Sequence, residues 1–255
     1  MGDEQIMAIS KCLITFKNKM SHFNADLDFI DILSTSIENG DYSNEEELFP
    51  GSSDEKYTTL SSYKVGDQNR RLVVNHLKST LYTAYIKDLY EEFSIYLKGI
   101  MKEVYSNARV TPERLSGEHK VTLSSVDILQ HLQKGDLADV VIDGIFQSLE
   151  GERSTIGLIT KFHKKIGIDI DQLLVDNAIY YLEIRHKLVH TDGYADEEFK
   201  KAHELLNYTS NSKIKLDYCT ICQAYEAVFN LVSDMDSKII SAGLAKSHTY
   251  KNETT

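Results

Sequence analysis

The sequence contains few of the residues that interrupt regular structure, since only 2 of its 255 residues are Pro and 13 are Gly. All-β and collagen-like folds require many more turn residues, so both are excluded. No apolar run approaches the roughly 18 residues that span a bilayer, and no membrane partner is expected. The acidic start of the chain lacks the features of a signal peptide. The 3 cysteines, an odd number, favour reduced thiols and a soluble cytoplasmic protein.

The net charge of −11 argues against a general binder of polyanions. The charge is unevenly distributed, because residues 1–60 carry 4 basic and 12 acidic side chains. Residues 153–190 carry 6 basic and 4 acidic side chains together with three histidines. A local polyanion site therefore remains compatible with this one segment.

Apolar residues recur three and four positions apart along nearly every long segment, which predicts an all-α fold without strands. We expect an up-and-down helical bundle over residues 61–245. An acidic N-terminal helical extension with a loop precedes it over 1–60, and a polar tail follows over 246–255. The expected helices cover about 5–38, 67–106, a short stretch after 124, 136–149, 155–165, 170–189, 195–206 and 217–242. The longest of these, over 67–106, is expected to contain a kink.

One segment, residues 180–194, has a composition unusual for scaffold. On a helical projection Arg185 falls at the centre of the apolar face, whereas His186 and His190 fall on the polar side with Glu183. An unpaired cation in a core is costly, so Arg185 requires a carboxylate, carbonyl oxygens or an anionic ligand. An ion pair with an acid on a neighbouring helix would satisfy Arg185 without any further function.

The run from Arg185 to His190 resembles the Arg-polar-x-x-x-His signature of HEPN domains, a superfamily of helical nucleotide-binding proteins and ribonucleases. His186 occupies the polar position, and Leu188 and Val189 occupy the apolar ones. The following turn through Gly193 is similar to the one in many members. The close match covers about twenty residues, and Arg-x4-His alone is a weak pattern. The resemblance implies a HEPN-like bundle with an additional N-terminal helical region.

The resemblance also implies a metal-independent endoribonuclease that needs no cofactor. His190 would serve as general base or acid, activating the ribose 2′-hydroxyl or protonating the leaving 5′-oxygen. Arg185 would hold the scissile phosphate and stabilise the charge of the transition state. His186 would orient these two residues or contact the phosphate. The products would be a 2′,3′-cyclic phosphate and a 5′-hydroxyl.

Arg185 and His190 are five residues apart, about 140° around an ideal helix, so they do not share a face. Either the helix unwinds after Leu188, or Arg185 of one copy approaches His190 of a second copy. A two-fold interface would bring two histidines together for the acid and base roles, and we therefore expect a homodimer.

Three hypotheses for the function follow. The first is a toxin or defence effector that cleaves RNA, with an antitoxin or regulatory protein as partner, since stand-alone members of the family often serve so. The second is a non-catalytic HEPN-like module that binds a nucleotide, RNA or a protein. The third is a structural helical protein in which Arg185 closes a buried ion pair.

Further basic residues could contact RNA. Lys161, Lys164 and Lys165 cluster before Gly167, and Lys187 lies inside the motif. The cluster also fits a solvated helix C-terminus whose cations complement the helix dipole. Tyr194 follows His190 by four residues, and some HEPN toxins carry a tyrosine behind the motif histidine that is modified with AMP. Packing is the alternative role for Tyr194.

Two weaker patterns suggest metal or redox chemistry. Cys219 and Cys222 form a CxxC, but Cys12 is the only other cysteine and cannot complete a four-ligand zinc site. We expect two helix-packed thiols at this CxxC. Glu183 and His186 have the spacing of half a di-iron site, but the second Glu-x2-His motif that such a site requires is missing. No metal site is predicted.

Overall fold

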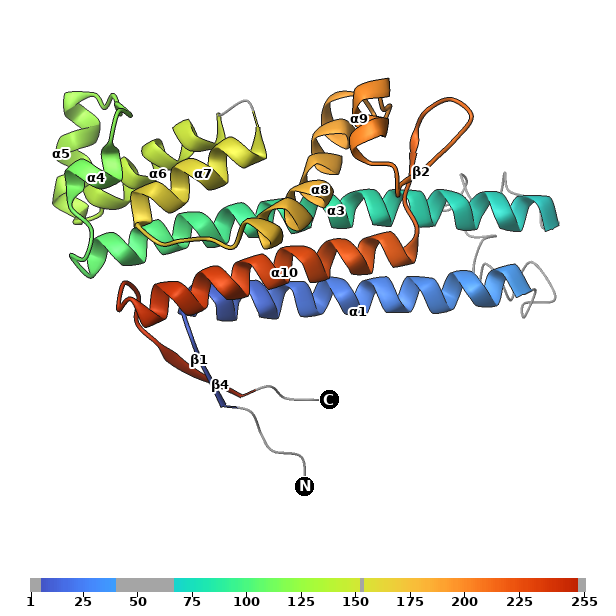
Figure 1. The fold of residues 1–255 in the computed structure, drawn as a ribbon, viewed down its shortest axis with the longest axis horizontal. Helices are drawn as coiled ribbons and strands as arrows, with labels where there is room; N and C mark the ends of the chain where they lie inside the picture. Colours follow the sequence, from blue (N-terminus) through green and yellow to red (C-terminus); the bar gives the residue numbers. More distant parts are fainter. Residues whose placement is uncertain (1–5, 40–66, 152–153, 252–255) are drawn as a thin grey trace, which may run out of the picture.

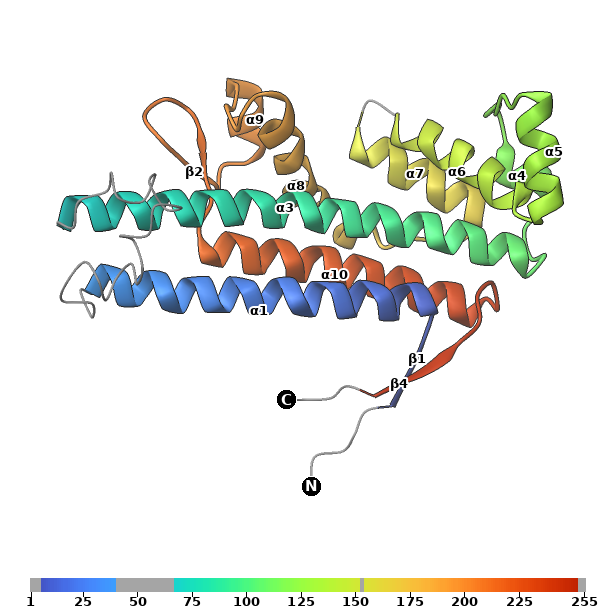
Figure 2. The ribbon, with the colours of Figure 1, turned by 180° about the vertical axis from the view of Figure 1, so that it is seen from behind.

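The computed structural model describes residues 6–39, 67–151 and 154–251. It is mostly helical, with 74% of residues in helices, which confirms the expected helical class. Three long helices lie side by side along the molecule (Figures 1 and 2), namely α1 (Lys11–Asn39), α3 (Asp67–Ser106) and α10 (Tyr218–Ser241). The helix α3 continues without interruption through its 40 residues, and the kink expected in it stays a prediction.

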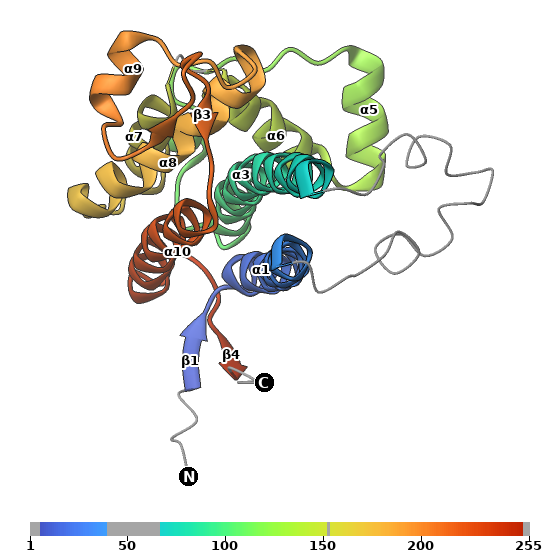
Figure 3. The same cartoon turned by 90° about the vertical axis from the view of Figure 1, so that its right-hand side faces the viewer.

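The shorter helices occupy two positions along α3 (Figure 1). Four of them gather beside its C-terminal half, namely α4 (Pro112–Ser116), α5 (Ser125–Lys134), α6 (Leu137–Glu150) and α7 (Thr155–Ile166). The chain then returns through α8 (Gln172–His190), which packs on α3 and α10, and through α9 (Glu197–Ala202). Figure 3 shows α8 above the layer that α3 and α10 form. The position of α8 places its C-terminal end over α3.

The core forms where the apolar stripes of the three long helices meet. Phe16 and Met20 of α1 are fully buried in this core. Phe93 and Leu97 of α3 are fully buried in it as well. Such spacings of three and four residues put apolar side chains on one helix face, and their burial supplies most of the stabilising free energy. The residues of α1 therefore belong to the same packed core as the rest of the bundle.

Four short strands were not expected from the sequence. Residues Ile6–Ile9 (β1) pair antiparallel with His248–Lys251 (β4), in the segment predicted as a polar tail. Asn207–Tyr208 (β2) pairs with Ile214–Lys215 (β3) as a small hairpin after α9. This hairpin follows a helix that ends at Ala202, earlier than the predicted 206.

A buried carboxylate connects the start of α1 to α10. Asp236 is fully buried and accepts hydrogen bonds from the backbone N–H and the hydroxyl of Ser10, and from the Tyr96 hydroxyl at 3.2 Å. Ser10 Oγ also accepts from the Leu13 N–H at 3.0 Å, which caps the first turn of α1. One polar cluster therefore holds α1, α3 and α10 together at their shared end.

The loop predicted after the first helix, from residue 41 to the start of the helix expected at 67, lies outside the described residues. The domain boundary predicted at residue 60 stays a prediction. The helix α1, which precedes this boundary, packs along α3 and α10, which follow it. Among the helices that the structure describes, none combines the length and apolar character needed to cross a membrane.

Candidate functional site

The motif segment forms the last turns of α8 and the turn that follows. Asp171 caps the start of α8 by accepting from the Leu173 N–H at 2.9 Å, and the helix continues to His190. It ends because the backbone then turns into the left-handed region at Asp192 and Gly193, with φ of 52° and 81°. The Gly193 N–H donates to the Lys187 carbonyl at 2.9 Å, which closes the turn.

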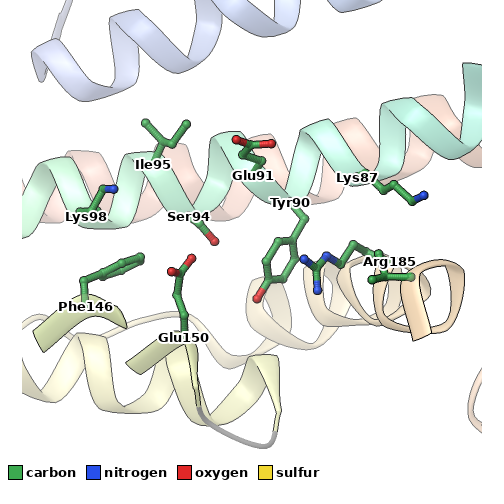
Figure 4. Close-up of a pocket in the computed structure, with 10 residues that line it drawn as sticks. Lys87, Tyr90, Glu91, Ser94, Ile95, Lys98, Phe146, Glu150 and Arg185 are labelled. Carbon is green, nitrogen blue, oxygen red and sulfur yellow. The ribbon is translucent and has the colours of Figure 1, made fainter. Parts of the chain in front are cut away.

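Arg185 projects from α8 toward α3 and is half-buried. Its guanidinium lies over the ring of Tyr90, 4.6 Å from the centroid (Figure 4). It forms no ion pair and no hydrogen bond with any side chain that the structure describes. The buried ion pair of the third hypothesis is therefore not present among residues 6–39, 67–151 and 154–251. Burial raises the pKa of Tyr90, and the Arg185 charge opposes that shift while Glu150 adds to it.

A cavity of about 340 Å³ lies next to this guanidinium. Its walls come from three helices, which are α3, the end of α6 and the end of α8 (Figure 4). Ser94 points into it from α3 and Glu150 from α6, and the two side chains face one another. Arg185 and Val189 close the cavity on the α8 side.

The two histidines of the motif lie on the outer side of α8. His186 and His190 are both exposed, and their ring centroids are 4.4 Å apart. Partial burial lowers the pKa of His186, and the neighbouring His190, Lys187 and Arg185 lower it further. A lowered pKa favours the neutral imidazole near pH 7, which is the form that accepts a proton.

Because α8 stays helical to His190, the helix does not unwind after Leu188. Within one copy, Arg185 therefore faces the cavity on α3 while His190 faces outward, about 140° away. The structure brings His186 and His190 together but does not bring His190 to the guanidinium of Arg185. Unwinding of the helix, the first of the two arrangements expected from the sequence, is therefore wrong, and the approach of a second copy stays a prediction.

The four lysines predicted to contact RNA have different surroundings. Lys187 pairs with Asp196 at 2.5 Å, and this ion pair holds the pKa of the Asp196 carboxyl below its usual value. Lys161 lies 3.3 Å from Glu118. Lys164 is exposed and distant from the motif in sequence.

Lys165 is buried, and its ammonium donates to the backbone carbonyls of Leu115 and Ser116 at 2.7 and 2.8 Å. Burial lowers its pKa. These contacts tie α7 to the end of α4, so this lysine supports the fold. Exposure leaves Lys164 as the member of the cluster that is best placed to reach an external phosphate.

Tyr194 is 48% exposed and lies in the turn after α8. It forms an isolated β-bridge with Lys213, whose ammonium lies 5.6 Å from the centroid of the Tyr194 ring. Its exposure leaves the ring accessible to modification, and packing into the core does not account for its position.

The CxxC does not form packed thiols, because Cys219 and Cys222 are both exposed on the first turns of α10. Their side chains point outward since the apolar stripe of α10 uses Ile221 and Ala224 instead. Glu183 lies 3.8 Å from Nε2 of His203, a buried histidine that the sequence analysis did not single out. Across the described parts of the chain, no three His, Cys, Asp or Glu side chains gather at metal-binding distance.

Sequence reasoning missed Tyr90, Ser94 and Glu150, which line the cavity. A signal for the first two exists in the α3 sequence, where polar or aromatic residues recur at 87, 90, 91, 94 and 98. These spacings of three and four put them on one side of the helix. Glu150 has no such signal, because its place depends on the packing of α6 against α3.

Comparison of the chain with family models, curated proteins and solved structures finds no match.

Proposed function

We propose that the chain is a metal-independent endoribonuclease of HEPN type, active as a homodimer. The observation that carries the proposal is the state of Arg185, a half-buried guanidinium at an open cavity without a carboxylate partner among the described residues. A cation in such a position favours an anionic ligand. A pair of exposed histidines on the same two turns adds groups that transfer protons near neutral pH.

The proposed reaction takes place between two copies. Arg185 of one copy binds the non-bridging oxygens of the scissile phosphate and stabilises the additional charge of the transition state. His190 of the second copy takes the proton of the attacking 2′-hydroxyl while water donates a proton to the leaving 5′-oxygen, or His190 donates to the 5′-oxygen while water takes the 2′-hydroxyl proton. The 2′-oxygen forms a bond to phosphorus as the bond to the 5′-oxygen breaks, which leaves a 2′,3′-cyclic phosphate and a 5′-hydroxyl. His186 lies beside His190 and orients it.

Two exposed side chains near the end of α8 support the dimer part of the proposal. Val189 is 43% exposed and Tyr194 is 48% exposed, so an apolar side chain and an aromatic ring flank His190 at the surface. Burial of such side chains against a second copy would stabilise the dimer and exclude water from the phosphate.

The biological role proposed with this activity is that of a toxin or defence effector in the cytoplasm, held in check by an antitoxin or regulatory partner. The resemblance of residues 185–190 to the HEPN signature supports this role. Expression in a bacterial host should arrest growth, and the His190→Ala variant should not. Growth that is arrested equally by both would contradict the role.

The activity is tested by incubating the full chain with total tRNA and with a structured RNA in EDTA. We expect cleavage that leaves cyclic phosphate ends, and its loss in Arg185→Ala and His190→Ala. The matched controls are Arg109→Ala and His22→Ala, which remove an exposed arginine and an exposed histidine away from α8. Both controls should cleave as the unchanged chain does, and all variants should keep the same helicity.

A non-catalytic binding module is the second candidate, because the cavity beside Arg185 is already formed in a single copy. Absence of cleavage by a chain that is dimeric in solution would favour this module. Cleavage that survives His190→Ala would refute the assigned role of His190.

A further inference from the structure

The cavity beside Arg185 is lined by positively and negatively charged side chains that form no ion pairs with other described residues. Five charged side chains line it: Lys87, Glu91, Lys98, Glu150 and Arg185. None of them forms an ion pair with another residue that the structure describes. A wall of unpaired cations and carboxylates fits a ligand that carries an anion at one end and hydrogen-bond donors at the other.

Ser94 provides an independent indication of a ligand. Its side chain is only 5% exposed, and the one polar side-chain neighbour of its hydroxyl among the described residues is the Tyr90 hydroxyl, in a hydrogen bond that lowers the pKa of Tyr90. The hydroxyl points into the cavity, toward Glu150 (Figure 4). A hydroxyl has one donor and two acceptor sites, so a ligand atom in the cavity would use the hydrogen-bonding capacity that Ser94 has left.

Two aromatic and two aliphatic side chains, Tyr90, Phe146, Ile95 and Val189, complete the wall. The ring of Tyr90 lies beneath the Arg185 guanidinium, and the buried ring of Phe146 lines the far side (Figure 4). Aromatic walls of this kind accommodate a planar base. The volume of about 340 Å³ is at the small end of the range for ligand pockets, so it suits one nucleotide and no longer segment.

We propose that this cavity binds a guanine nucleotide of the RNA and thereby selects the cleavage site. Arg185 contacts the phosphate, and the Glu150 carboxylate accepts from N1–H and N2–H of the base. The Ser94 hydroxyl donates to O6 of the base, an acceptor. Selection of the cleavage site rests on the proposed ribonuclease function, whereas nucleotide binding to the cavity does not.

The Glu150 carboxylate is the reason that the cavity is expected to prefer guanine to the other bases. Guanine presents two adjacent donors on its Watson–Crick edge, which match the two oxygens of one carboxylate. Adenine and cytosine each present one exocyclic donor next to a ring acceptor, and that acceptor repels a carboxylate. Uracil presents one donor between two acceptors. Only guanine therefore pairs with Glu150 without placing an acceptor against it.

Binding of mononucleotides tests the proposal without any cleavage step. The full chain is titrated by calorimetry with guanosine monophosphate, adenosine monophosphate, cytidine monophosphate and inorganic phosphate. We expect guanosine monophosphate to bind at least about tenfold more tightly than the other three ligands. Equal affinity for the three nucleotides, or no binding of guanosine monophosphate, would overturn the proposal.

One variant and a matched control locate the binding. Glu150→Gln replaces one acceptor oxygen by a donor and should lower the affinity for guanosine monophosphate about tenfold or more. Glu198→Gln is the matched control, since Glu198 is exposed on α9 outside the cavity, and it should bind as the unchanged chain does. Guanosine monophosphate binding that survives Glu150→Gln would overturn the assignment.

Ser94→Ala separates a ligand-binding hydroxyl from a structural one. Removal of this hydroxyl should change the melting temperature little, because only the Tyr90 hydroxyl is near it among the described side chains, while the affinity for guanosine monophosphate falls. A lower melting temperature with unchanged affinity would assign Ser94 to the fold and contradict its role in binding.

The outcomes also distinguish this proposal from the ribonuclease function. Tight binding of guanosine monophosphate without RNA cleavage in EDTA would retain the cavity assignment and reject the ribonuclease. Cleavage in EDTA without preference for guanosine at the cut, and without guanosine monophosphate binding, would retain the ribonuclease and reject the cavity assignment.

Discussion

His186 and its neighbour His190 stand out at the scale of single residues, because their rings are close although both are exposed. Partial burial lowers the pKa of His186 from its ordinary value of 6.5, and His190 is the second cause. Replacement of His190 by Ala should therefore raise the pKa of His186 part of the way back. Proton NMR titration of the imidazole signals measures this shift. An unchanged His186 pKa in His190→Ala would show that the two rings do not interact.

The lowered pKa also sets the sign of a pH effect on stability. The unfolded chain binds a proton at His186 more readily than the folded chain does. The contribution of this residue is therefore fully present above about pH 6.5 and is lost as the pH falls through the lowered folded value. His186→Ala should remove this part of the acid sensitivity.

Ser10 and Ser34 are both buried serines, but within the part of the chain that the structure describes only the Ser10 hydroxyl has hydrogen-bond partners. Ser10→Ala should lower the free energy of unfolding by about 1–3 kcal/mol, because it removes a donor to Asp236 and the cap of the first turn of α1. Ser34→Ala is the matched control, since it removes a hydroxyl with no partner among the described residues. Urea unfolding compares the two, and an equal loss in both variants would contradict the role of Ser10.

The hydrogen bonds between Ser10 and Asp236 make stability depend on pH. Burial raises the pKa of Asp236, and the Ser10 hydroxyl opposes this shift. Because the folded pKa is raised, the contribution of Asp236 is present below the unfolded value of 3.8 and is lost as the pH rises through the folded value. Loss of the Ser10 hydroxyl should therefore cost more at pH values above the folded pKa of Asp236, where the carboxylate is charged, than at pH values below it.

At the scale of elements, the close approach of α1 to α3 depends on Gly99. A Cβ built at this position would lie 2.8 Å from Sγ of Cys12. That thiol is largely buried, and burial raises its pKa to about 12, so it remains protonated and unreactive. Gly99 therefore sets the distance between the two helices.

A double-mutant cycle tests this contact. Gly99→Ala should destabilise the bundle because the added methyl group meets the thiol, despite the higher helix propensity of Ala. In the Cys12→Ala background the same change should be neutral or stabilising. We expect a coupling of about 1–2 kcal/mol in the free energy of unfolding, measured with urea. Additive effects would show that the two residues do not meet.

The helices were predictable from the sequence, whereas the strands were not. The apolar spacing along α3, α8 and α10 reports burial on one face, and that information is local. The pairing of β1 with β4 joins residues that are more than 200 positions apart, and neither strand has an alternating pattern of its own. The pairing of β1 with β4 depends on the positions of the start of α1 and the end of α10, which lie close together only in the folded chain.

The candidate site also contains residues that the sequence predicted and residues that it did not. Arg185, His186 and His190 were found because they are adjacent in the sequence at the end of an amphipathic helix. The cavity that Arg185 faces was not predicted, since Tyr90 and Glu150 reach it from two other helices. Burial of Lys165 was also hidden, because its carbonyl partners belong to α4.

At the scale of the whole molecule, the net charge of −11 opposes tight binding to nucleic acid. An RNA substrate would therefore be held locally, at the end of α8, and with modest affinity. The proposed dimer would place two such ends together. Its molar mass by light scattering should be twice the 29.0 kDa of one chain.

The central claim is that the site combines Arg185 of one copy with His190 of the other. Two mixed dimers, each purified with a different tag on either copy, test it in the RNA cleavage assay. The first pairs Arg185→Ala with His190→Ala and so retains one intact pair of residues contributed by different copies. The second pairs an unchanged copy with the Arg185→Ala/His190→Ala double variant, in which no such pair survives.

The account predicts cleavage by the first mixed dimer, well above that of either single variant alone, and none by the second. The reverse pattern, in which the first is inactive and the second keeps about half of the original activity, would place both residues in one copy and contradict the account.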